Sequence, residues 1–267
     1  PVINRHPIKL TPFDLARLHG NTNVKSVLRE QFLLAKLRTG DEFAWKKAFP
    51  ELYPLATGIA YNLVRSRDDA DDLAIEALTE LEELTREEKV VAVGETGLDF
   101  FRDFSPRPTQ IASFERHIEL ASRTGLPMFL HERDSYPSFG EILKSHRDYI
   151  SRQVVHCFTG KKAALYSYLD LDCYIGITGW ICDERRGEHL LKLVQDIPAS
   201  RLMIETDAPY LMPRNIRPKP RSRRNEPMYL PVVAEKVAVC RGVSTAELAA
   251  LTTRNAKEFF DLPDPVA

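Results

Sequence analysis

The chain has 267 residues, enough for one large α/β barrel or two small domains, and 43% of them are hydrophobic, enough for a well-formed core. Its 37 basic and 38 acidic residues give a net charge of −1, so any nucleic-acid binding must come from a local basic patch and not from an overall positive field. The four cysteines form no CxxC pair, and we find no membrane-length apolar run or signal-peptide core, so we expect a reduced, cytoplasmic protein without membrane contact.

Residues 1–87 show helical periodicity and little that is typical of strands. Apolar residues recur at helical spacing from 73 to 84, behind an acidic start at 68–72 that suits the positive end of a helix dipole. Two further helical stretches are expected at about 24–37 and 42–64, the second interrupted by prolines. We therefore predict a helical N-terminal segment over residues 1–87.

The pattern changes after Lys89 to short apolar runs that alternate with amphipathic stretches. The expected strands are residues 90–93, 127–130, 154–155, 174–177 and 202–204. The expected helices are residues 110–123, 139–146, 162–169, 188–194 and 229–239. This alternation predicts a parallel sheet with helices outside it over residues 88–267. Only five strands are visible, whereas a closed (β/α)₈ barrel has eight.

Four of these strands lead to a side chain that can bind a metal ion: Glu95, His131, His156 and Asp207. A single such histidine is more often a hydrogen-bonded loop residue, and Asp207 by itself could cap a helix. Four of them at equivalent positions are better explained by a site, because parallel α/β folds place their active sites at the carboxyl ends of strands. Carboxylate and imidazole ligands together suit Mg²⁺, Mn²⁺ or Zn²⁺.

Several motifs resemble those of the TatD family of metal-dependent deoxyribonucleases. They are GETGLDF (94–100), HERD (131–134), HCFTG (156–160), YIGITGW (174–180), ETDAPYL (205–211) and RRNEP (223–227). The resemblance implies an amidohydrolase-type TIM barrel with one or two divalent ions, acting on DNA. It further implies that Glu95 is a catalytic, metal-bridging carboxylate and that His131 and His156 are metal ligands. By the same resemblance, Asp207 is a metal ligand that also takes the proton of the attacking water.

A basic run follows Asp207, from Arg214 to Arg224. Most of its residues are best interpreted as a solvated loop. Arg223 and Arg224 are the expected phosphate contacts, because guanidinium groups match phosphate oxygens. Glu226 is expected to orient them or the loop, and the resemblance places Arg214 where it could also reach substrate.

The first part of the chain departs from the family pattern. Family members begin with a strand that carries an HxH motif, and this chain has no HxH, so the barrel's first three strands are expected to be absent or replaced. The segment instead contains GDEFAW (40–45), ELYPLATGIAYNLV (51–64) and RDDADDLAIEAL (67–78). With these stretches, residues 34–84 resemble region 2 of an extracytoplasmic-function sigma factor, which implies a helical hairpin that contacts RNA polymerase.

Three functions follow from these observations. The first is an active TatD-like deoxyribonuclease whose N-terminal helices pack against an incomplete barrel. The second is a catalytically impaired, chimaeric chain with an N-terminal interaction module. The third is a metal-dependent hydrolase of another ester, lactone or amide, since the same barrel serves many substrates.

Overall fold

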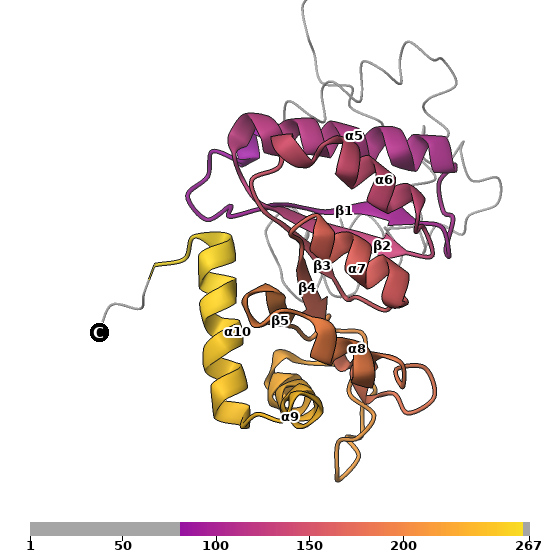
Figure 1. Cartoon of the computed structure of the whole chain (residues 1–267), viewed down its shortest axis with the longest axis vertical. Coiled ribbons are helices and arrows are strands. Elements are labelled where there is room, and N and C mark those ends of the chain that lie inside the picture. Colours follow the sequence, from indigo (N-terminus) through magenta and orange to yellow (C-terminus); the bar gives the residue numbers. More distant parts are fainter. Residues whose placement is uncertain (1–80, 264–267) are drawn as a thin grey trace, which may run out of the picture. The chain divides into compact units, whose positions relative to one another are not determined.

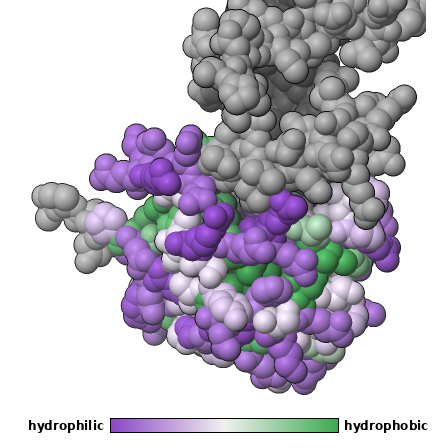
Figure 2. Space-filling model, turned by 90° about the horizontal axis from the view of Figure 1, so that it is seen from above, coloured by the Kyte–Doolittle hydropathy of each residue, from purple (hydrophilic) through white to green (hydrophobic). Residues whose placement is uncertain are grey.

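A computed structural model describes residues 81–263 of the chain (Figure 1). The predicted N-terminal helices, the sigma-factor-like segment and its polymerase contact lie outside these residues, apart from residues 81–84, which are helical. No helix of the described part is long and apolar enough to cross a membrane. Hydrophilic residues cover most of the described face shown in Figure 2, with apolar residues visible between them.

The described part is an α/β structure around one parallel sheet. The strands are β1 (Val93–Asp99), β2 (Met128–Arg133), β3 (Gln153–His156), β4 (Tyr174–Ile177) and β5 (Leu202–Ile204). The α-helices are α5 (Arg107–Thr124), α6 (Ser138–Ser145), α7 (Lys162–Asp170), α8 (Leu190–Asp196), α9 (Leu230–Arg241) and α10 (Thr245–Phe260). Short 3₁₀ helices occupy Arg147–Tyr149, Gly179–Cys182, Ala199–Arg201 and Pro227–Tyr229.

The five strands pair in chain order, β1-β2-β3-β4-β5, and every pair is parallel. Helix α5 packs against β1, while α9 and α10 pack against β5. The repeating unit of a (β/α) barrel is a strand followed by a helix, which leads to the next, parallel strand. The predicted TIM-barrel-like α/β fold is therefore confirmed, with five of its strands in the described residues.

The two faces of the sheet are different. Toward the helices, alternate strand residues such as Leu98, Leu130 and Val155 join one large buried cluster with Phe114 of α5 and other helix side chains. On the other face a smaller apolar cluster is formed by Val154, Tyr174, Met203 and Phe259. Because successive side chains on a strand point to opposite faces, His156 lies on the same face as Val154, two residues before it.

Two elements differ from the prediction. The expected strand at 90–93 was wrong in its bounds, because β1 begins at Val93 and continues through a polar sequence, VGETGLD. Apolar content did not reveal this strand, since it carries site residues. Helix α10 was not predicted, although Ser244 and Glu247 form a capping box at its start, with the Ser244 side chain accepting the Glu247 backbone N–H.

Candidate metal centre

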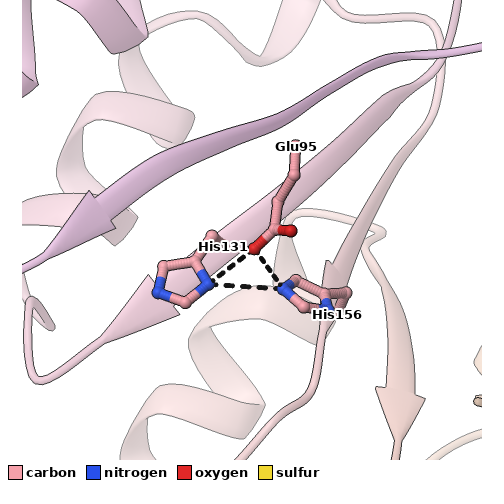
Figure 3. A group of neighbouring side chains, drawn as sticks. All are labelled: Glu95, His131 and His156. Carbon is pink, nitrogen blue, oxygen red and sulfur yellow. Dashed lines mark hydrogen bonds and ion pairs between the residues drawn. The ribbon is translucent and has the colours of Figure 1, made fainter. Parts of the chain in front are cut away.

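Three side chains from neighbouring strands meet in one small group: Glu95 of β1, His131 of β2 and His156 of β3 (Figure 3). Glu95 Oε1 lies 2.9 Å from His131 Nδ1 and 2.8 Å from His156 Nε2. The two histidine nitrogens are 3.3 Å apart. All three potential ligand atoms lie within 4.8 Å of one another, so they could share one metal ion.

The strand register explains why these residues meet. His131 pairs with His156 across β2 and β3, so both rings project from the same level and the same face. On β1, Glu95 sits at an irregularity between the pairs Gly94–Phe129 and Thr96–Leu130. Such bulges redirect a side chain and are common beside active sites. The sequence places Glu95 just after a strand, whereas it lies inside β1.

Gly97 allows β1 to approach His131 closely. Its φ is +148°, a conformation that residues with a side chain rarely adopt, and an added Cβ would lie 1.9 Å from the His131 backbone oxygen. A glycine is therefore required at this position of the GETGLDF motif for the strands to pair.

Asp99 fixes the orientation of His131. Its Oδ2 lies 3.2 Å from His131 Nε2, while His131 Nδ1 faces Glu95. Burial raises the pKa of Asp99, but the backbone N–H of Arg102 and the charges of His131 and Arg102 lower it by more, so the carboxylate stays ionised. An ionised Asp99 accepts a hydrogen bond from the Nε2–H group of His131, which leaves the unprotonated Nδ1 as a potential ligand atom.

Glu205 stands on the other side of His156. Its Oε1 lies 3.8 Å from His156 Nδ1 and accepts a hydrogen bond from the backbone N–H of Cys157. Burial lowers the pKa of His156, but the hydrogen bond to Glu95 and the charge of Glu205 raise it by more. His156 is only 4% exposed, and its Nε2 faces both Glu95 and the Nδ1 atom of His131, while its Nδ1 faces Glu205.

The charges around the group fit a bound cation. The histidine hydrogen bonds hold the pKa of Glu95 far below its usual range, so Glu95 is a full negative charge. Burial raises the pKa of both Glu205 and Asp207, and the charge of Glu95 adds to this rise. A divalent ion held by Glu95, His131 and His156 would offset this crowding of negative charge, and one carboxylate with two imidazoles is an ordinary Zn²⁺ or Mn²⁺ ligand set.

Asp99 was missed from the sequence, although it lies within GETGLDF, four residues after Glu95. Replacing it with Asn should weaken metal binding about 10- to 100-fold, because the ring of His131 loses its anionic partner. Titration of the metal-stripped protein with Mn²⁺ or Zn²⁺ measures this. Asp103→Asn is a control, since Asp103 pairs with Arg107 outside the group. An Asp99→Asn affinity equal to that of the control would contradict the orienting role.

Asp207 does not belong to the close group of three. It lies three residues beyond the end of β5, with a φ of +53°. Burial is the largest effect on the pKa of Asp207 and raises it. The charge of His156 lowers this pKa and the charge of Glu95 raises it, and the net shift is upward. Asp207 is thus electrostatically linked to the group, and a raised pKa suits a carboxylate that accepts protons.

The predicted substrate-binding residues lie on exposed loops. Arg214 pairs with Glu184 at 3.3 Å and is 3.9 Å from Asp183, so carboxylates already hold its charge. Arg223, Arg224 and Glu226 are exposed.

Asn225, buried between Arg224 and Glu226, ties their loop to the end of β5. Its side chain donates to the Thr206 carbonyl, and its backbone N–H donates to the Pro209 carbonyl at 3.0 Å. This loop is therefore fastened next to Asp207. The RRNEP motif contained Asn225, but its anchoring role depends on burial, which the sequence did not show.

The family profile and the similar proteins that match this chain all point to the TatD family. The profile of a family described as TatD related DNase matches residues 44–261. The match therefore includes residues 44–87 of the predicted N-terminal segment. A Klebsiella pneumoniae (strain 342) protein named 3'-5' ssDNA/RNA exonuclease TatD is 49% identical over 179 residues, 67% of this chain and 68% of that protein. Its namesake from Erwinia amylovora is 48% identical over 193 residues, 72% of this chain and 74% of that protein.

Solved structures show the same similarity. A TatD homolog from Escherichia coli K12 superposes with a TM-score of 0.62 at 28% identity, over 76% of this chain and 74% of that one. A TatD family hydrolase from Entamoeba histolytica gives 0.59 at 26% identity, over 75% and 71%.

Proposed function

This chain belongs to the family of TatD related DNases, and on that basis we propose that it is a divalent-metal-dependent nuclease that hydrolyses phosphodiester bonds in single-stranded DNA. The observation that carries the proposal is the meeting of Glu95, His131 and His156 within 4.8 Å on one face of the sheet. The name of these relatives covers both DNA and RNA, and the family description favours DNA.

Each site residue has a place in this proposal. Glu95, His131 and His156 would hold Mg²⁺, Mn²⁺ or Zn²⁺, with Asp99 and Glu205 orienting the two rings. When bound, such an ion would supply positive charge against the phosphate and lower the pKa of water. Asp207, with its raised pKa, accepts the proton of the attacking water.

The exposed arginines serve substrate binding. Arg223 and Arg224 contact backbone phosphates from the loop that Asn225 anchors beside Asp207, and Glu226 helps to hold that loop. Arg214 contributes only if substrate displaces its carboxylate partners, which would cost the existing ion pairs.

The test is cleavage by the full chain of end-labelled single-stranded DNA, RNA and duplex DNA of one sequence. We expect the metal-stripped protein to be inactive and added divalent ions to restore shortening of the single-stranded DNA. Cleavage that persists in chelator would refute the metal dependence. A folded, metal-loaded chain that cuts none of the three would instead support the impaired, chimaeric alternative.

A further inference from the structure

The side chain of Arg133, in the HERD motif, contacts neither the group of Glu95, His131 and His156 nor the carboxylates that orient the two histidines. His131 belongs to the group. Glu132 is buried and accepts hydrogen bonds from the backbone N–H and the hydroxyl of Ser135, at 2.8 and 2.9 Å, so it holds the loop after β2. Asp134 is exposed, in a left-handed turn conformation. Within strand β2, which ends at Arg133, the motif therefore leaves one charged side chain without a role.

The guanidinium group of Arg133 lies against aromatic rings. Its central carbon is 4.3 Å from the ring centre of Phe101 and 5.7 Å from that of Trp180. Among the residues that the structure describes, it has no carboxylate partner and no hydrogen bond. Ring contacts cover the flat faces of a guanidinium group but leave the N–H groups at its edge free.

Arg133 is also close to the metal group. It lies two residues beyond His131 on β2, which places both side chains on the same face and about 7 Å apart along the strand. Its backbone pairs with Asp99, the residue that orients His131. An anion bound to Arg133 would thus be a neighbour of the proposed ion.

Other arginines of this region are already paired or unsupported. Arg102 pairs with Asp99 at 2.9 Å, and Arg186 with Asp183 at 2.8 Å. Arg223 and Arg224 are exposed on their loop, with no ring packed against them in the described residues. Arg133 combines an open N–H edge with a position that is fixed before substrate arrives, so binding would cost it less conformational entropy.

We propose that Arg133, held by Phe101 and Trp180, is the binding site for a phosphate of the substrate strand next to the cleaved bond. The proposal rests on the proposed nuclease function and adds a residue and a ligand group to it. Phe101 and Trp180 are positioning residues, because they hold the guanidinium group and leave its edge to the phosphate oxygens. Phe101 is 62% exposed, so a nucleic-acid strand can reach this place from solvent.

The test measures binding without hydrolysis. Fluorescence anisotropy of a labelled oligothymidylate is followed with the full, metal-stripped chain in chelator, over a range of salt concentrations. For Arg133→Gln we expect the Kd to rise about tenfold or more, as for loss of a charged hydrogen bond. The plot of log affinity against log salt should become shallower by about 0.7, the value for one phosphate contact on a single strand.

Three further variants isolate the cause. Arg254→Gln, which removes an exposed arginine of α10, should leave both the Kd and the slope unchanged. Arg133→Lys should keep the slope but raise the Kd about threefold, because it keeps the charge without the planar fork. Phe101→Leu should also raise the Kd about threefold at constant slope, since the charge stays and its support is lost. The two latter variants decide the question if Arg133→Gln does not fold.

An abasic strand of the same length separates phosphate binding from base stacking. We expect Arg133→Gln to weaken its binding as much as that of oligothymidylate. If Arg133→Gln weakened binding only of the strand with bases, the phosphate assignment would be overturned. It would also be overturned if Arg133→Gln had the same Kd and salt slope as Arg254→Gln on both strands. A wild-type chain that binds no oligonucleotide would overturn it too. A wild-type chain that binds with the expected Arg133 dependence but never cleaves would refute the nuclease function and leave this site standing.

Discussion

Replacing Glu95 with Gln is expected to abolish metal binding at the centre and to lower the nuclease rate about a thousandfold or more. Oε1 of Glu95 is the atom that both histidines face, at 2.9 and 2.8 Å, so it is the shared point of the group. The amide removes the one full negative charge among the three ligands. A bound ion is worth several kcal/mol to the reaction, and each 1.4 kcal/mol corresponds to about tenfold in rate.

Calorimetric titration with Mn²⁺ and a cleavage assay on single-stranded DNA measure the two effects of this change. Glu184→Gln is the matched control, because Glu184 is an exposed carboxylate that pairs with Arg214 outside the group. We expect the control to bind metal at the wild-type stoichiometry. If Glu95→Gln also bound at that stoichiometry and affinity, the group of three would not be the metal site.

The parallel sheet could be predicted because several of its strands contain short apolar runs. β3, β4 and β5 keep this pattern, and the predicted runs at 154–155, 174–177 and 202–204 fall within them. β1 does not, since five of its seven residues are Gly, Glu, Thr or Asp. Its pairing depends on glycines that permit close approach, which is a tertiary requirement invisible to hydrophobic periodicity.

The clustering of Glu95, His131 and His156 was predictable for a different reason. Parallel strands bring their carboxyl ends to one edge, so His131 and His156 had to lie close together once their strands were neighbours. The orienting carboxylates were harder to find. Asp99 lies in GETGLDF and Glu205 in ETDAPYL. Only their distances to the histidine rings distinguish them from the other acidic residues of the chain. The same holds for Arg133, whose proposed role depends on two rings from distant parts of the chain.

Asp207→Asn is expected to lower the cleavage rate about 100- to 10,000-fold, the range for loss of a general base. An amide cannot accept a proton at neutral pH. Asn is also the replacement that best tolerates the backbone of this residue, whose φ is +53°. The fold should therefore be retained, which circular dichroism and thermal melting would check. Asp134→Asn is the matched control, since Asp134 is exposed and has a φ of +52°.

Metal stoichiometry then separates two roles for Asp207. Its carboxylate is outside the group of three ligands, but its pKa responds to both His156 and Glu95. We expect Asp207→Asn to bind metal at the wild-type stoichiometry and to lose only turnover, as a proton acceptor would. If metal binding were lost together with activity, Asp207 would act as a ligand, as the family resemblance implies. An unchanged rate would exclude both roles and would leave the proton of the attacking water to another base.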